Sequence, residues 1–351
     1  MRDSIFFEED AWRFLRRIRQ QYTDIWLLCD AHTQTCCLPA FERQFGDIAP
    51  GRLLVMPAGE NAKTITTAIQ LWAQLQKGNA RRDSMLLNLG GGVACDMGAF
   101  VASTWKRGIP FIHIPTSLMA QADAAIGGKC ALDSEGVKNQ IGLFRLPVAV
   151  CILHEWLHTL PPEEIRSGYA EMLKHGILAD ADYFRELCGN TETGTLPTTE
   201  QIRRSVHLKL QFAAPDPEDR GLRKALNFGH SIGHVLEALS GGRLRHGEAV
   251  AQGMRAEAHI AWELGLLPTA DYGEINRELQ QRYGAFPLLD CSEAELLTLL
   301  SADKKNDAAS ANFSLPTAIG KIRTNQAVPS ATVWETLRAL SGESSGKLRN
   351  A

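Results

Sequence analysis

Polar side chains recur at helical spacing in the segment GLRKALNFGHSIGHVLEA, which contains Arg223, Asn227, His230 and His234. Successive gaps of four, three and four residues place them on one face of a single predicted helix. His246 follows in the segment LRHGEAV. Two imidazoles one helical turn apart, with a third nearby, suggest a metal site.

Most HxxxH pairs are ordinary surface or core histidines, but two further features favour a metal here. Gly229 and Gly233 would each cost a helix about 1 kcal/mol relative to alanine, so we expect the backbone to approach another segment closely at this point. Glu171, three residues before Lys174 on another predicted helix, offers a carboxylate. Two neutral imidazoles, one carboxylate and an open position are typical of catalytic rather than structural zinc.

Two glycine turns predict a nucleotide site. Gly90, Gly91 and Gly92 follow an apolar run and precede a predicted helix that carries Asp96. Such a turn lets the backbone approach a pyrophosphate at a helix N-terminus, although a tight turn without a ligand would look the same. A second turn, MPAGENAK, lies one strand earlier and carries Glu60 and Lys63, which could also be a solvated pair. In a parallel sheet both turns emerge at the carboxyl edge, which favours a dinucleotide.

The segment that begins at IPTS and ends at NQIG is poor in residues that form a core. Asp123, Lys129, Lys138 and Asn139 are dispersed there among small residues. Lysines among glycines can reach a bound anion as point charges. The alternative is an exposed loop with scattered lysines.

Composition narrows the class of protein. The chain has 351 residues and a formal net charge of −3, and its basic residues occur singly, so no nucleic-acid partner is expected. The first residues lack the apolar core of a secretory signal, and no segment has the roughly 20 apolar residues of a membrane span. Eight cysteines without CxxC or disulfide-framework spacing predict reduced thiols in a cytosolic protein.

The elements that position these residues fall into two halves. Short apolar runs alternate with helical stretches in the first half, which predicts a mostly parallel sheet covered by helices, a Rossmann-like α/β fold. From about Pro161 the pattern is helix after helix. We therefore expect an α/β nucleotide-binding domain over residues 1–160 and an all-α metal- and substrate-binding domain over residues 161–351.

At this point the residues resemble a known family, 3-dehydroquinate synthase, within the sugar-phosphate cyclase superfamily. The resemblance runs from about Asp30 to Ile322, and the segments that carry it follow in family order: PAGENAK, GGGVACDMGAF, STWKRGIPFIHIPTSL, DAAIGGKCALDSEGVKNQIG, TLPPEEIRSGYAEMLKHG, GLRKALNFGHSIGHVLE, RHGEAV and DKKND.

The resemblance implies a role for each candidate residue. The implied metal ligands are Glu171, His230 and His246, and His234, which spacing alone would make a ligand, is implied to be catalytic or substrate-binding instead. The implied contacts to NAD are Asp30, Glu60, Lys63, Gly91, Gly92, Asp96, Thr116, Ser117, Lys129, Lys138 and Thr159. The implied catalytic and substrate contacts are Asp123, Lys129, Asn139, Lys174, Lys209, Arg223, Asn227, His234 and one of Lys304 and Lys305, with Lys305 preferred. Arg107 resembles an arginine that crosses a homodimer interface to the neighbouring subunit's substrate phosphate.

The implied activity is that of a phosphorus–oxygen lyase of the shikimate pathway. It converts 3-deoxy-D-arabino-heptulosonate 7-phosphate into 3-dehydroquinate and phosphate, with NAD and Zn²⁺ (or Co²⁺) as cofactors. The implied steps are a transient oxidation by NAD, β-elimination of phosphate, re-reduction, and an intramolecular aldol closure. A lysine- and arginine-rich pocket suits an anionic sugar phosphate.

Departures from the family pattern keep other functions open. Ser117 and Cys130 replace usual threonines, Asp219 replaces a usual glutamate, and DAHT replaces a usual aspartate-x-asparagine around His32. The GGK at Gly127–Lys129, with Asp123 and Asn139, favours dehydroquinate formation over the valiolone- and inosose-forming relatives. The alternatives are another cyclase of the superfamily, a metal-dependent polyol dehydrogenase, and a catalytically silent paralogue, the last disfavoured because no principal ligand or lysine is missing.

Overall fold

The computed structural model describes residues 4–135, 137–189, 195–287, 291–301 and 310–343. The chain divides into two compact units, each described here by itself. Unit 1 comprises Met1–Gly168 and Leu196–Leu210, and unit 2 comprises Tyr169–Thr195 and Gln211–Ala351. The divide falls within two helices, α6 (Pro162–Ala179) and α8 (Thr199–Ala213).

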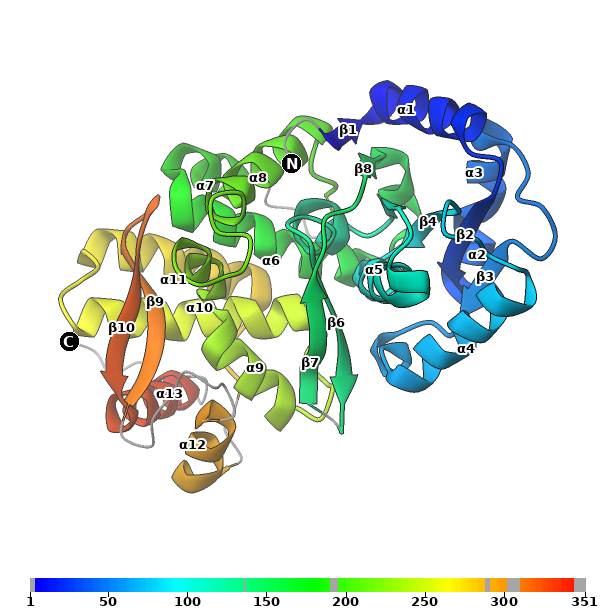
Figure 1. Cartoon of the computed structure of the whole chain (residues 1–351). Helices are drawn as coiled ribbons and strands as arrows, with labels where there is room; N and C mark the ends of the chain where they lie inside the picture. Colours follow the sequence, from blue (N-terminus) through cyan, green and yellow to red (C-terminus); the bar gives the residue numbers. More distant parts are fainter. Residues whose placement is uncertain (1–3, 136, 190–194, 288–290, 302–309, 344–351) are drawn as a thin grey trace. The chain divides into compact units, whose positions relative to one another are not determined.

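Unit 1 contains a six-stranded sheet among its described residues (Figure 1). Every pairing in it is parallel. In spatial order the strands are β1 (Ile5–Phe7), β8 (Ala149–Ile152), β5 (Phe111–Pro115), β4 (Met85–Gly90), β2 (Ile25–Asp30) and β3 (Leu53–Met56). The parallel α/β fold predicted for this half is confirmed.

Alternate residues of the central strands pack into separate cores on the two faces of the sheet. Leu27 and Leu87 join one cluster, while Leu28 and Leu86 join the other. The first cluster includes side chains of α1 (Glu8–Gln21) and α3 (Leu38–Phe45), and the second includes side chains of α4 (Ile65–Lys77) and α5 (Gly92–Thr104). Because helices cover both faces, β4 is buried along its whole length and reads as the near-continuous apolar run MLLNLG.

A β-hairpin lies in the segment where the sequence suggested dispersed charges among small residues. A short π-helix, Ala120–Ala124, precedes the antiparallel strands β6 (Lys129–Ser134) and β7 (Val137–Phe144). β6 contributes Cys130 and Leu132 to the core, whereas β7 is largely exposed. Three large apolar residues of β7 therefore face outward, namely Val137, Ile141 and Phe144.

Unit 2 is mostly helical, as predicted. Besides the parts of α6 and α8 that belong to it, its helices are α7 (Ala181–Cys188), α9 (His230–Leu239), α10 (His246–Glu263), α11 (Thr269–Tyr283), α12 (Glu293–Ser301) and α13 (Ser330–Glu343). An antiparallel pair, β9 (Ser310–Ala318) and β10 (Lys321–Pro329), adds a hairpin that the helical pattern did not predict (Figure 1). Among the described residues, no helix is both long and apolar enough to cross a membrane.

Candidate active site

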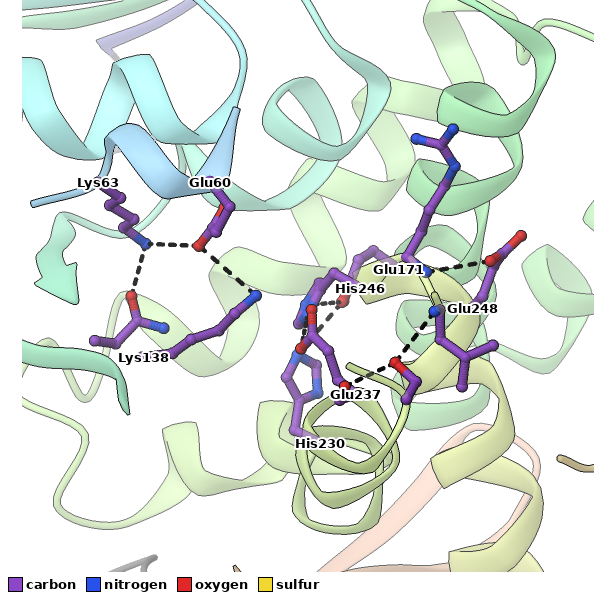
Figure 2. Close-up of polar contacts among 12 residues, drawn as sticks. Glu60, Lys63, Lys138, Glu171, His230, Glu237, His246 and Glu248 are labelled. Atoms are coloured by element: carbon purple, nitrogen blue, oxygen red, sulfur yellow. Dashed lines mark hydrogen bonds and ion pairs between the residues drawn. The ribbon is translucent and has the colours of Figure 1, made fainter. Parts of the chain in front are cut away.

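A carboxylate and two imidazoles converge in unit 2. Glu171 comes from the middle of α6, and His230 and His246 are the first residues of α9 and α10 (Figure 2). Glu171 Oε1 lies 3.4 Å from His230 Nε2 and 3.8 Å from His246 Nε2. One ligand atom from each residue lies within 4.8 Å of the others.

This donor set suits a tetrahedral zinc ion. Zinc–nitrogen bonds of about 2.0–2.1 Å require ligand atoms roughly 3.3 Å apart, close to the spacings found here. Burial, together with the Lys174 ammonium, lowers the pKa of His230, which favours the neutral imidazole that a metal needs. Glu171 is fully buried and forms an ion pair with Lys174 through its other oxygen, Oε2.

The prediction that one helix carries Arg223, Asn227, His230 and His234 is wrong. The structure instead has a 3₁₀ segment, η6 (Leu222–Asn227), then a break, then α9 beginning at His230. Gly229 adopts a left-handed φ of 79°, which ends any continuous helical face. Arg223 and Asn227 therefore lie on a different element from His230 and His234.

The close backbone approach predicted from the glycines is confirmed. A Cβ at Gly233 would lie 3.1 Å from the Ala249 carbonyl oxygen, and a Cβ at Gly229 would lie 2.4 Å from Met254 Cγ. Gly253 of α10 completes the contact, because a Cβ there would lie 2.0 Å from the Gly229 carbonyl oxygen. α9 and α10 thus pack backbone to backbone, and their first residues bring His230 and His246 to one place.

The other residues of unit 2 that the sequence predicted for the site have different environments. The exposed His234 ring lies 5.5 Å from the His230 ring and 5.9 Å from the His246 ring, centroid to centroid. Arg223 is buried and donates from Nη1 to the Pro217 carbonyl oxygen at 2.8 Å. Asn227 is half-buried in η6. Lys304 and Lys305 lie outside the described residues.

A second charged cluster lies in unit 1, after β3. Lys63 Nζ pairs with Asp96 Oδ2 at 2.6 Å and donates to Asn139 Oδ1 at 2.7 Å. Glu60 Oε1 lies 4.0 Å from Lys63 Nζ and 3.7 Å from Lys138 Nζ (Figure 2). Burial opposes the charge on Lys63, but the carboxylates of Asp96 and Glu60 outweigh it and raise the lysine pKa. Burial also raises the pKa of Asp96 to about 6, although Lys63 lowers it.

The glycine turn after β4 lies at the carboxyl edge of the sheet, as predicted. Gly91 precedes α5 and provides no side-chain cap, and Gly92 is the first residue of that helix. Thr116, after β5, donates its N–H to the Gly90 carbonyl oxygen at 3.0 Å. Ser117 Oγ would lie 3.4 Å from a Cβ at Gly91, so the Ser117 side chain lies beside this turn.

The remaining candidates of unit 1 are spread over several elements. Lys209 Nζ pairs with Asp123 Oδ1 at 2.8 Å and donates to the Asp123 carbonyl oxygen at 2.7 Å. Asp30 caps α2 (Ala31–Cys36) by accepting the N–H of His32 at 2.8 Å. Lys129 is exposed at the start of β6.

Two further candidates end short 3₁₀ segments. Thr159 is exposed at the end of η5 (His154–Thr159), where its hydroxyl donates to the Trp156 carbonyl oxygen at 2.8 Å. Arg107 is exposed at the end of η3 (Trp105–Arg107), where Lys106 and Arg107 both have positive φ angles, of 47° and 69°.

Sequence reasoning missed two carboxylates beside the site residues. Glu237 Oε2 lies 3.4 Å from His246 Nδ1, on the opposite side of the ring from Glu171. Its position seven residues after His230, two helical turns along, is a signal that could have identified it. Asp133 Oδ1 accepts the backbone N–H of Asn139 at 2.8 Å, a hairpin contact with no sequence signal.

Comparison with known proteins identifies the family. The model of the 3-dehydroquinate synthase N-terminal region matches residues 53–167, and the model of its C-terminal region matches residues 168–306. The chain belongs to the 3-dehydroquinate synthase family. It is 37% identical over 323 residues to the 3-dehydroquinate synthase of Parabacteroides distasonis, covering 90% of this chain and 91% of that protein. It is 41% identical over 296 residues to that of Thermosynechococcus vestitus, covering 82% and 80%.

Solved structures of related cyclases have the same fold. A 2-deoxy-scyllo-inosose synthase complexed with carbaglucose-6-phosphate, NAD⁺ and Co²⁺ aligns with a TM-score of 0.86 and 23% identity, covering 95% of this chain and 96% of that one. The 2-epi-5-epi-valiolone synthase of Streptomyces hygroscopicus, with NAD⁺ and Zn²⁺ bound, aligns with a TM-score of 0.84 and 25% identity, covering 97% and 96%. A glycerol dehydrogenase of Schizosaccharomyces pombe aligns at 0.66 with 15% identity, covering 97% and 89%, and shares the fold alone.

Family membership confirms the expected activity. The chain is an enzyme that forms 3-dehydroquinate and phosphate from 3-deoxy-D-arabino-heptulosonate 7-phosphate, a phosphorus–oxygen lyase. The sequence analysis predicted this same family, and that prediction is confirmed.

Proposed function

We propose that the reaction takes place at a metal centre formed by Glu171, His230 and His246. The observation that carries this proposal is the convergence of their three ligand atoms within 4.8 Å. Zn²⁺ is the proposed metal and Co²⁺ an alternative, which agrees with the metals that the two related cyclase structures contain. Two imidazoles and one carboxylate leave a coordination position for substrate hydroxyls.

NAD is the proposed second cofactor, bound at the carboxyl edge of the parallel sheet. The carboxyl edge of such a sheet, with its helix N-termini, is the usual dinucleotide site. The charged cluster around Lys63 supports this location, because Lys63 and Lys138 can meet the anionic part of the cofactor. The proposed contacts are Asp30, Glu60, Lys63, Gly91, Gly92, Asp96, Thr116, Ser117, Lys129, Lys138 and Thr159.

The substrate brings a carboxylate, a phosphate and several hydroxyls, which cations and amides of this chain can bind. The proposed contacts are Asp123, Lys129, Asn139, Lys174, Lys209, Arg223, Asn227, His234 and Lys305. When bound, NAD supplies a reversible hydride acceptor and the metal supplies Lewis acidity. His234 is the proposed group that moves protons, since its exposed imidazole lies beside the metal donors. Lys174 pairs with Glu171 and is positioned to hold a substrate oxygen near the metal.

A homodimer is the proposed assembly, with Arg107 reaching the phosphate in the partner's site. Support comes from β7, which exposes the three large apolar residues Val137, Ile141 and Phe144. We further propose residues 1–160 as the nucleotide-binding domain and residues 161–351 as the metal-binding domain. The proposed compartment is the reducing cytoplasm, in keeping with cysteines that are thiols in the described residues.

Turnover with metal-replete protein, NAD and the heptulosonate phosphate tests this function. We expect one phosphate per carbocycle, with no build-up of NADH absorbance, because the hydride returns to the substrate. A polyol dehydrogenase would instead accumulate NADH without releasing phosphate. Another cyclase of the superfamily would release phosphate but give a different ring, so the product is identified by mass and NMR.

A further inference from the structure

Glu257 is a fully buried carboxylate of unit 2 that lies against the N-terminus of α9. It lies on α10, three helical turns after His246, and none of its surface is exposed. Its Oε2 accepts the Gly229 N–H at 2.7 Å, and its Oε1 accepts the Ile232 N–H at 3.2 Å. The Glu257 side chain thus accepts hydrogen bonds from Gly229 and Ile232, the residues that flank His230 and Ser231.

These N–H groups would otherwise lack partners. The first N–H groups of any helix have no intrahelical acceptor, and Gly229, the N-cap of α9, has no side chain to supply one. Burial raises the pKa of Glu257 to about 8, while the N–H groups of Gly229 and Ile232 favour the carboxylate. Glu257 therefore does from a neighbouring helix what an N-cap side chain does locally.

The orientation of the His230 ring depends on the backbone turn at Gly229. His230 Nδ1 lies 3.2 Å from the Phe228 carbonyl oxygen, and its Nε2 lies 3.4 Å from Glu171 Oε1. Gly229, which has a left-handed backbone conformation, connects Phe228 to His230. Its N–H donates to Glu257 Oε2. A shift of this turn would move both ring nitrogens away from their partners.

We propose that Glu257 is a positioning residue for the metal centre, holding the turn at Gly229 so that His230 presents Nε2 beside Glu171. The inference rests on the proposed metal site. It adds a residue that contacts no metal or substrate and acts only through the backbone that carries His230.

The test compares Glu257→Gln with a matched control, Glu263→Gln. Glu263 lies at the end of the same helix, and its partners are His259, at 3.3 Å, and the Thr336 hydroxyl, at 3.2 Å. Glutamine preserves shape but turns one acceptor into a donor facing a backbone N–H. We expect Glu257→Gln to weaken Zn²⁺ affinity by about 10- to 100-fold in chelator competition, the usual effect of losing an outer-shell partner. The Co²⁺ absorption spectrum should also change, and Glu263→Gln should stay within about threefold of wild type.

Hydrogen exchange on the metal-free wild type gives a second test that needs no variant. We expect the amides of Gly229 and Ile232 to be protected without metal, because Glu257 holds them. Rapid exchange of both amides would overturn the inference.

The outcomes separate this inference from the proposed function. If wild type binds one metal per chain and a folded Glu257→Gln binds it equally well with an unchanged spectrum, Glu257 has only a structural role and the inference fails alone. A lowered unfolding midpoint with unaltered metal affinity would likewise limit Glu257 to a structural role. If wild type binds no stoichiometric metal, the proposed centre fails and the inference fails with it.

Discussion

Glu171 is a fully buried carboxylate whose two oxygens face different groups. Oε2 pairs with Lys174, and Oε1 faces the Nε2 atoms of His230 and His246. An ionised carboxylate is costly to bury unless charges or a metal compensate it. Lys174 supplies one positive charge, and the two imidazoles direct their Nε2 atoms to a point where a cation would supply another.

Replacing any of the three proposed ligands should empty the metal site. Glu171→Ala, His230→Ala and His246→Ala each leave two protein ligands, so we expect loss of both stoichiometric zinc and activity. His234→Ala should lose activity but retain the metal, which elemental analysis of the purified variants measures. The assignment would be reversed if His234→Ala emptied the site while His230→Ala did not.

His113 should make the protein sensitive to acid. It is buried in β5, and burial lowers its pKa to about 3. The unfolded chain binds a proton at this histidine below about pH 6.5, whereas the folded chain does not, so the free energy of unfolding rises with pH from about 3 to 6.5. Its contribution is lost as the pH falls, by up to about 1.4 kcal/mol per pH unit.

Urea unfolding at pH 5 and pH 7 measures this contribution. His113→Gln should unfold more easily at both values but show a smaller difference between them. His32→Gln is the control, since His32 is exposed. An unchanged pH difference in His113→Gln would contradict the prediction.

At the scale of elements, the site depends on how closely α9 and α10 approach each other. Gly253 lies where the two backbones meet, and an added Cβ would be 2.0 Å from the Gly229 carbonyl oxygen and 2.7 Å from the Gly233 nitrogen. Both are backbone atoms and cannot rotate away. The separation of the helices, and with it the spacing of His230 and His246, is therefore controlled by glycine.

Gly253→Ala should force the two helices apart. We expect the free energy of unfolding to fall by about 1–3 kcal/mol, as for other overpacked sites, and metal affinity to fall as well. The control is Gly273→Ala in α11, where a Cβ would meet nothing within 4 Å. That variant should gain about 0.5–1 kcal/mol from helix propensity. Equal stability of the two variants in urea unfolding would contradict the prediction.

At the scale of the whole molecule, the proposed dimer links two observations on unit 1. β7 exposes Val137, Ile141 and Phe144, and Arg107 is an exposed cation at the end of η3. Two consecutive non-glycine residues with positive φ, Lys106 and Arg107, are uncommon and indicate a locally specified turn. Such a turn could present a side chain to a partner subunit.

Mixing two impaired variants tests the proposed action of Arg107 across the dimer. Arg107→Ala should lower activity by about ten- to a few hundred-fold, because a charge-assisted bond is worth about 1.5–3 kcal/mol. Combined with His234→Ala subunits, it should regain activity as one site per mixed dimer becomes complete. Native mass spectrometry verifies subunit exchange. Exchange without regained activity would mean that Arg107 acts in its own subunit or has no role in catalysis.

Local physics made much of this protein predictable from its sequence. Apolar runs such as MLLNLG identify strands buried on both faces, and glycines between a strand and a helix identify the turn at Gly91. The cost of glycine in a helix predicted the close approach at Gly233. Residue types also indicated metal chemistry, because imidazole and carboxylate are the usual protein ligands of catalytic zinc.

Which side chains converge was decided only by tertiary structure. Helical spacing favours His230 with His234, yet the left-handed Gly229 begins α9 at His230, and the packing of α9 on α10 brings in His246. Glu257 caps a helix from a distant part of the chain, a contact that local spacing does not encode. Sequence periodicity indicates which face of one element is apolar. The partner of a buried polar group depends instead on which other element passes beside it. Packing between residues far apart in the sequence determines that neighbour.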